Sequence, residues 1–497
     1  MRFQPSLWVL ACVAATSITI SARSAPAGEA FWYGTEMEAP VAKGINDFLV
    51  TQQGPLEVLQ QSMMTFDNTG GRTGLQRWVQ GKTWDGYTLL SSIGGTRTIL
   101  IDMQGNVRKT WPLFPFPAKM LPNGDIIGGD PTGRLEGHQE MAALVQMDWC
   151  GKPRWQWRPN VPGGARQHHD WQREGNPVGY YAPGLKPMIT GGKTLILAHE
   201  NPPQSETLAV SDIMETEEDV IYEVDADGNI QWKWEPYTHI DQMGFGPVER
   251  ESIRTQKVGA PEGIGGGFPG TDWQHINSVS YLGQNRWHDA GNARFHPDNI
   301  IWDGRSSNII AIVARYDDPK GQWKSGDIVW RVGPDYSWGR PEYSLGQIIG
   351  QHHAHMIPRG LPGAGNILVF DNGGLAGFGP LFDGGPAFWP NTLRNYSRVI
   401  EFNPLTLEVK WEYALTAPAG DDRKFFSWYI SSAQRLKNGN TLIDEGARGR
   451  VFEVTPEGEI VWEYISPFSV GPAFGTAVYR AYRVPEEWVP IDNTCAP

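Results

Sequence analysis

The sequence predicts an all-β fold, a six-bladed β-propeller built from four-stranded antiparallel sheets. A unit of two strands that ends in tryptophan recurs six times along the chain, and most copies follow a second hairpin. Asn-Gly turns between alternating apolar runs mark the leading hairpins, and helical periodicity is nearly absent. Two hairpins make one four-stranded blade, and six blades close around an axis.

The recurring unit runs from an apolar strand through a turn rich in Asp, Asn, Pro and Gly into a strand that ends in Trp. The first three copies span residues 101–111, 145–157 and 224–234, and the later copies end at residues 327–330, 408–413 and 458–464. The leading hairpin is clearest at residues 120–127 and 436–443, where Asn-Gly forms the turn.

The two ends of the chain are predicted to share one blade. The first copy supplies only three strands, at residues 87–90, 98–102 and 107–111, and residues 477–484 supply the fourth. This closure removes exposed sheet edges. The chain then divides into a signal peptide (residues 1–25), an amino-terminal arm or small subdomain (26–85), the propeller (86–485) and a tail (486–497).

The amino terminus predicts export to the periplasm or the medium. A charged start, a short apolar run over residues 7–20 and small residues before position 28 are typical of a secretory signal. No later stretch has the length of a membrane span. Of three cysteines, Cys12 leaves with the signal, and Cys150 and Cys495 either form a disulfide or remain a buried thiol and a loose one.

The formal net charge of −13 argues against nucleic acid as a partner. An anionic ligand therefore needs local positive or hydrogen-bonding groups.

Polar residues gather at matched positions of four units, ahead of each leading hairpin. These blocks are residues 167–171, 272–278, 350–356 and 427–432. They contain six of the 11 histidines: His168, His169, His275, His352, His353 and His355. Equivalent positions of a circular repeat converge at one end of the axis, so we expect these side chains to meet in one funnel.

The second strand of the leading hairpin is expected to contribute further polar groups. We place these strand ends at residues 195–200, 310–316 and 370–372. Arg315 ends an otherwise apolar strand, and a buried arginine needs a negatively charged partner. That partner is either a carboxylate such as Asp371 or a bound oxyanion.

These motifs resemble those of the bacterial periplasmic arylsulfate sulfotransferases, over residues 90 to 485. The matching segments are residues 168–170, 272–278, 350–352, 370–373, 396–398 and the blade ending 411–413. The resemblance implies a six-bladed propeller that transfers a sulfuryl group from an aryl sulfate to a phenol. It further implies a sulfohistidine intermediate and neither a metal nor a nucleotide cofactor.

Carried over motif by motif, the resemblance makes His352 the nucleophile. His275, Asn277, Arg315 and one of His168 or His169 would surround the sulfate. We assign substrate binding to His353, His355, Tyr429, Asp371 and Asn372. A neutral imidazole is a good nucleophile and leaves readily, and fixed donors stabilise charge spread over the oxygens of a sulfuryl group.

Two other classes of protein fit the same histidines. A copper, iron or zinc centre formed by His169, His275, His353 and His355 would make a metal-dependent lyase, hydrolase or oxidoreductase. A binding propeller would use the histidines only as hydrogen-bonded funnel residues. A quinone-dependent dehydrogenase fits less well, because it usually has more blades and an acidic calcium site.

Overall fold

The computed structural model describes residues 71–497 with short gaps. The gaps are residues 94–95, 131–139, 160–165, 209, 211–216, 256–271, 375, 381–386, 389–393, 395, 416–424, 470–474, 491–494 and 496–497. The predicted signal peptide and residues 26–70 of the predicted arm lie outside the described residues. Among the helices that are described, none is long and apolar enough to cross a membrane.

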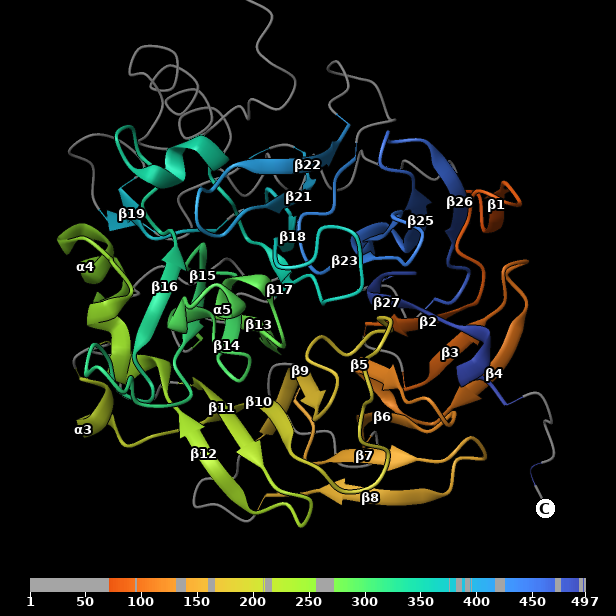
Figure 1. The fold of residues 1–497 in the computed structure, drawn as a ribbon, viewed down its shortest axis with the longest axis horizontal. Helices are drawn as coiled ribbons and strands as arrows, with labels where there is room; N and C mark the ends of the chain where they lie inside the picture. The colour runs from red at the N-terminus through yellow and green to blue at the C-terminus, as the bar shows by residue number, and fades with distance from the viewer. Residues whose placement is uncertain are drawn as a thin grey trace, which may run out of the picture.

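Six antiparallel sheets stand in a ring around one axis, which confirms the predicted six-bladed propeller (Figure 1). From the axis outward, the first three blades are β27 (Val478–Val484), β2 (Tyr87–Ser92), β3 (Thr98–Ile101) and β4 (Val107–Trp111); β5 (Phe114–Met120), β6 (Ile126–Gly129), β7 (Leu144–Met147) and β8 (Pro153–Trp157); and β9 (Arg166–Arg173), β10 (Thr194–Glu200), β11 (Glu218–Val224) and β12 (Ile230–Trp234).

The remaining three blades follow the same order. They are β13 (Ile276–Tyr281), β14 (Ile300–Gly304), β15 (Ile309–Val313) and β16 (Ile328–Val332); β17 (His352–Met356), β18 (Ile367–Asp371), β21 (Arg398–Phe402) and β22 (Val409–Ala414); and β23 (Ser432–Arg435), β24 (Thr441–Glu445), β25 (Arg450–Val454) and β26 (Ile460–Ile465), with β1 (Gly74–Trp78) outermost.

Short elements fill the connections between strands. They are β19 (Gly379–Pro380), β20 (Ala387–Phe388), α3 (Gln204–Thr207), α4 (Pro247–Thr255), α5 (Arg286–Asp289) and the 3-10 turns η2 (Pro236–Gln242), η3 (Ala293–Phe295), η4 (Pro341–Leu345), η5 (Gly446–Arg448) and η6 (Glu486–Trp488).

The recurring turn and the terminal tryptophan have separate structural roles. In blade three, Asp225 Oδ1 accepts from the N–H groups of Asp227 and Asn229 at 3.0 and 2.9 Å, and Gly228 takes φ = 86°. This arrangement closes the hairpin between β11 and β12. Tryptophans near the blade edges then donate an indole N–H to a backbone carbonyl in the outer hairpin of the next blade. The pairs are Trp155 to Ala226, Trp234 to Gly326, Trp330 to Pro404, Trp411 to Pro456 and Trp462 to Met103, all at 2.8–2.9 Å.

Blade one is closed by the C-terminal strand, as predicted. Strand β27 pairs antiparallel with β2, from Tyr87 opposite Val484 to Ser92 opposite Val478. Strand β1, which lies in the predicted arm, pairs with β26 as a fifth strand of blade six. Cys150 and Cys495 form a disulfide with their Cα atoms 5.3 Å apart, so the bonded alternative is the observed one.

Blade four corrects the predicted strand order. The second strand is β14, and the strand predicted in that place, at residues 310–316, is the third, β15. Because neighbouring strands run in opposite directions, the correction moves the residues after β15 to the other end of the blade.

Buried charges occupy the axis between the inner strands. Asp170 on β9 accepts from Arg480 Nη1 on β27 at 2.8 Å and from Lys119 Nζ on β5 at 2.5 Å. All three side chains are buried. Burial opposes ionisation of Asp170, but the two cations hold its pKa below the usual range. The ion group links blades one, two and three across the centre of the ring.

We expect Asp170→Asn to destabilise the protein by about 3–5 kcal/mol, because it leaves two buried cations without their counter-ion. Urea unfolding of the variant measures this loss. The matched control is Asp317→Asn, which breaks an exposed pair with Lys324 and should leave the stability nearly unchanged, because solvent screens such pairs. Equal stability of the two variants would contradict a stabilising role for the axial charges.

Candidate active site

Three inner strands are irregular at their histidines. His169, His275 and His353 have φ of 47°, 50° and 59°, in the left-handed region that side chains other than glycine rarely adopt. The strand register shifts beside each of them, in the β9–β10, β13–β14 and β17–β18 pairs. Such bulges turn a side chain away from the regular alternation. Strained backbone of this kind is concentrated at functional sites.

Ring contacts show which of the two adjacent histidines of blade three lies beside His275. The ring of His169 lies 4.8 Å from that of His275, whereas His168 stacks on His199 with ring centroids 3.6 Å apart. His169 also packs edge-on against Phe116 at 4.5 Å. His169 therefore stands beside His275, and His168 lies behind it.

His352 is held in one tautomer. Its Nδ1 lies 2.8 Å from Asn372 Oδ1 and 3.0 Å from the carbonyl oxygen of Gly350. Both partners only accept, so Nδ1 carries the hydrogen. The backbone N–H of Ile430 donates to Nε2 at 3.1 Å, so the lone pair is on Nε2. Burial and then the charge of Arg305 lower the pKa of His352 well below its ordinary value, which keeps the ring neutral.

His275 is oriented by a carboxylate. Asp272 Oδ2 lies 2.5 Å from His275 Nδ1, and Asp272 Oδ1 accepts from the backbone N–H of the same histidine at 3.0 Å. The carboxylate holds the hydrogen on Nδ1 and directs Nε2 away from Asp272. This pair has the form of a carboxylate-supported general acid or base.

The structure does not bring Arg315 to these histidines. Ile276, next to His275, pairs with Gly304, and Gly304 pairs with Ile309, at the start of β15. Arg315 follows the other end of β15, beyond about 13 Å of strand. Its guanidinium binds Glu223 at 3.0 Å, so the protein itself supplies the anionic partner, and Arg315 lies away from the histidines that were predicted to share the sulfate with it.

A different arginine is at the predicted place. Arg305 follows β14, and its backbone N–H donates to the carbonyl of His275 at 3.0 Å. Its side chain is buried, and burial lowers its pKa to about 10, against the opposing charge of Asp272. The guanidinium has no hydrogen bond or ion pair with a residue in the described part of the chain, and its Nε is buried without a partner. A buried guanidinium that lacks an ion-pair partner is a favourable binding group for an anion.

The sequence did contain a signal for Arg305. It follows the apolar second strand of its blade, as Asn372 follows β18. The sequence prediction missed Arg305 because it placed β15 as the second strand of the blade.

His353 and His355 form a second pair away from His275. Their rings lie 4.5 Å apart, and Tyr180 Oη lies 2.8 Å from His355 Nε2. Tyr482 is a further neighbour, 5.8 Å from the ring of His353. The four histidines of the alternative metal centre are thus split into two pairs, and the metal-capable groups found among the described residues do not combine them.

The other assigned residues have mainly supporting positions. Asn277 donates its amide to the carbonyl of Gln351, next to His352, at 2.9 Å. The side chain of Asn372 is hydrogen-bonded to His352 and does not line an open position for substrate. Tyr429 is partly buried and stacks on Trp428 with ring centroids 3.9 Å apart.

Asp371 is not available to a substrate. Its carboxylate binds Arg394 and Arg398, each at 2.7 Å, and accepts from the backbone N–H of Ile349. The side chain is fully buried. These partners occupy both carboxylate oxygens, so the geometry gives no support to the predicted substrate-binding role of Asp371.

The fold and the site define a β-propeller that presents a neutral His352 at one end of its axis, next to a buried Arg305 that forms no ion pair within the described part of the chain. The chain belongs to the arylsulfotransferase (ASST) family, whose profile matches residues 80–465. Membership supports arylsulfotransferase activity in general, and the family acts on aryl sulfates and phenols. A search of curated proteins finds no significant match.

Solved structures of low identity also align with the chain. A Bacteroides caccae protein of unknown function is 12% identical, with 80% of this chain and 99% of that chain covered and a TM-score of 0.40. Virginiamycin B lyase from Staphylococcus aureus is 10% identical, with 80% and 90% covered and a TM-score of 0.33. A putative 6-phosphogluconolactonase from Bacteroides fragilis is 9% identical, with 82% and 99% covered and a TM-score of 0.34. Scores this low carry no functional inference.

We expect nitrogen NMR of labelled protein to show His352 protonated on Nδ1 and neutral as the pH falls through 6.5. Its lowered pKa means that the second proton binds only at more acidic pH. Asn372→Leu removes an Nδ1 acceptor and should mix the two tautomers. A His352 ring that titrates near pH 6.5, or carries its proton on Nε2, would contradict the assigned state.

Proposed function

We propose that the protein transfers a sulfuryl group from an aryl sulfate to a phenol through a sulfohistidine at His352. The observation that carries this proposal is the fixed neutral tautomer of His352 beside the guanidinium of Arg305, which forms no ion pair with any residue that the structure describes. The first group supplies a lone pair and the second a positive charge, which is what attack on a sulfate ester needs. The propeller encloses both in a buried site.

In the first step, Nε2 of His352 attacks sulfur and the bond from sulfur to the aryl oxygen breaks. The phenolate leaves with the bonding electrons and takes the Nε2 proton of a doubly protonated His275, whose Nδ1–H stays bound to Asp272, so the ring becomes neutral. In the second step, the neutral His275 accepts the proton of the incoming phenol, whose oxygen takes the sulfuryl group. His352 returns to its starting state, so both half-reactions balance without an oxidant or a nucleotide.

Ile430 has a part in the first step. Its backbone N–H occupies the Nε2 lone pair of His352 in this structure, so the attack requires that this hydrogen bond be released. Ile430 and Ser431 both have positive φ, 52° and 94°, which marks this connection as strained.

The sulfate oxygens require donors around them. In the proposal Arg305 takes the place predicted for Arg315, with His169 and His275 as neighbouring imidazole donors. Asn277 fixes the backbone next to His352 through Gln351. Charge spread over the equatorial oxygens of a loose transition state is stabilised by such preset donors.

A buried aromatic cluster lies beside the histidines. Tyr429 packs against a buried cluster that includes Phe116, Tyr479 and Ile430. Phe116 lies 4.0 Å from the ring of Tyr479 and 4.5 Å from that of His169. We assign these rings, rather than Asp371, to holding the aryl sulfate or the phenol. With the predicted export, we further propose that the protein meets these small aromatic partners outside the cytoplasm.

His352→Ala should lower transfer by about 10³-fold or more, because the covalent intermediate has no other nucleophile. Intact-protein mass after incubation with an aryl sulfate and no acceptor checks this. The wild type should gain one SO₃ group on His352 and lose it when phenol is added. His288→Ala, a histidine on α5, is the matched control. A stable adduct on a residue other than His352 would overturn the nucleophile assignment.

Arg305→Ala should reduce kcat/KM for the donor by about 10²–10³-fold, as the loss of one preset charge on a developing anion does. Arg315→Ala, the residue that the motif comparison favoured, should keep near wild-type turnover. Steady-state kinetics on a chromogenic aryl sulfate measures both, with melting curves to confirm folding. The reverse order of effects would restore Arg315 as the sulfate ligand.

A further inference from the structure

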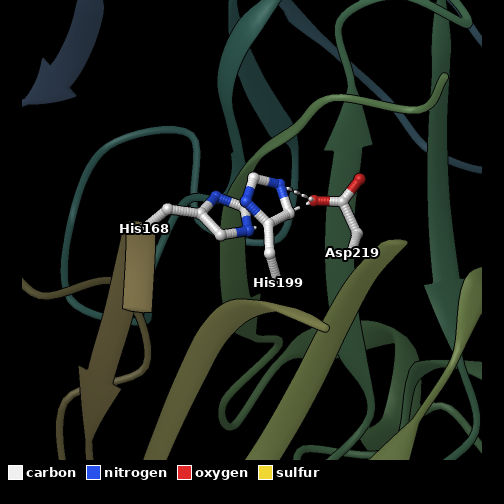
Figure 2. A group of neighbouring side chains, drawn as sticks. All are labelled: His168, His199 and Asp219. Atoms are coloured by element: carbon white, nitrogen blue, oxygen red, sulfur yellow. Dashed lines mark ion pairs between the residues drawn. The ribbon is translucent and has the colours of Figure 1, made fainter. Parts of the chain in front are cut away.

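A second polar group lies behind His169, in blade three. His168 on β9, His199 on β10 and Asp219 on β11 lie together on three strands of that blade (Figure 2). Asp219 Oδ1 lies 3.3 Å from His168 Nε2, and the other nitrogen of His168, Nδ1, lies 2.7 Å from His169 Nδ1. A carboxyl group and two imidazoles therefore follow one another, from Asp219 to a ring that stands beside His275.

The contact between Asp219 and His168 joins two atoms that lack other partners. Asp219 Oδ1 and His168 Nε2 are both buried, and neither has a hydrogen-bond partner elsewhere in the described part of the chain. Asp219 Oδ2, by contrast, accepts from the backbone N–H of Ile276 at 3.0 Å. Because a backbone N–H only donates, a hydrogen on this carboxyl group belongs on Oδ1, the oxygen nearer to His168.

His199 holds the ring of His168 in place without sharing this contact. The two rings stack with their centroids 3.6 Å apart and 19° between their planes, so their Nε2 atoms point in separate planes. His199 Nε2 is the farther of the two from Asp219 Oδ1, at 3.6 Å. His199 Nδ1 lies 3.0 Å from Glu140 Oε1, and Glu140 is paired with Arg166 at 2.7 Å. That carboxylate keeps the hydrogen of His199 on Nδ1, away from Asp219.

The surroundings of Asp219 favour its protonated form. The side chain is buried, and no Lys or Arg pairs with it among the described residues. Burial and then the charge of Asp272 raise the pKa of Asp219 to about 7, and the charges of His199 and His275 act in the opposite direction. Burial lowers the pKa of His168 to about 4, so this ring is neutral.

We propose that Asp219, as a neutral carboxylic acid, fixes the hydrogen of His169 on Nε2 by way of His168. The O–H of Asp219 donates to His168 Nε2, and the Nδ1–H of His168 donates to His169 Nδ1. A neutral imidazole has one N–H and one lone pair, so His169 then carries its hydrogen on Nε2. His169 Nε2 has no hydrogen-bond partner within the described residues, so this hydrogen is free to bind an anion.

This inference rests on the proposed function, in which His169 donates to a sulfate oxygen. Asp219 and His168 are positioning residues, because they act only through His169. Deprotonation of the chain reverses its direction. The proton leaves from His169 Nε2, the two shared hydrogens each move one position toward Asp219, and the negative charge ends on that carboxylate. His169 Nε2 then presents a lone pair, which repels a sulfate oxygen, so the donor is lost as the pH rises through about 7.

Nitrogen NMR of full-length protein with labelled histidines tests the relay. At about pH 5.5 the wild type should carry the His169 hydrogen on Nε2, and at about pH 8.5 on Nδ1. Asp219→Asn keeps an N–H donor toward His168 and an oxygen acceptor toward Ile276, so it should hold the Nε2 tautomer at both pH values. Asp219→Leu removes the donor and should mix the two tautomers. Asp317→Asn, which changes an exposed carboxylate, is the matched control and should behave as the wild type does.

The KM for the donor is a second measurement. Asp219→Leu should raise the KM for a chromogenic aryl sulfate by about 10-fold, as the loss of one hydrogen bond to a charged group does. Asp219→Asn should keep the low KM of the wild type and lose its rise above about pH 7. A purely structural role of Asp219 would not separate these two variants by pH.

Three results would overturn the proposal. One is a wild-type His169 with its hydrogen on Nδ1 at about pH 5.5. Another is that Asp219→Leu keeps the wild-type tautomer at both pH values, and the third is that Asp219→Asn gives the same mixture as Asp219→Leu. Melting curves verify folding, and the wild-type pH series decides the question even if Asp219→Leu does not fold. The NMR needs no substrate, so it stands apart from the test of the sulfohistidine.

Discussion

The buried pair of Asp170 with Arg480 is the interaction on which closure and site both depend. Arg480 reaches Asp170 only when the C-terminal strand β27 takes its place as the inner strand of blade one. The same guanidinium donates to the backbone carbonyl of Asn277 at 2.6 Å, and Tyr479 donates to the carbonyls of His169 and Asn277, each at 3.0 Å. One strand therefore closes the ring and fixes the backbone at two histidine blocks.

This dependence explains how the propeller maintains a strained site. A non-glycine residue in the left-handed region costs on the order of 1 kcal/mol or more, and three inner strands carry one at a histidine. The six-sheet core and the carbonyl bonds from β27 supply the compensating energy. The result is a placement of imidazoles that regular strands could not give, because regular strands alternate side chains between faces.

Acidic and basic side chains occupy different positions around the histidines of the site. Acidic groups such as Asp219 and Asp272 lie behind or beside the histidines, while Arg305 stands next to His352 and pairs with no carboxylate in the described part of the chain. A protein with a net charge of −13 thus offers a local positive site to an anion. The low-dielectric surroundings strengthen that attraction and keep His352 neutral at the same time.

The sequence by itself determined the architecture and the clustering of histidines. Period-two strands, turn residues and repeated tryptophans are local signals, and the missing strand of blade one pointed directly to residues 477–484. Only the tertiary structure decided which side chains meet. Arg305 and Arg315 both follow apolar strands, but antiparallel neighbours end at opposite ends of a blade, so one miscounted strand exchanged them. His168 and His169 are adjacent in sequence, and a bulge set by contacts from distant strands turned one toward His275 and the other toward His199.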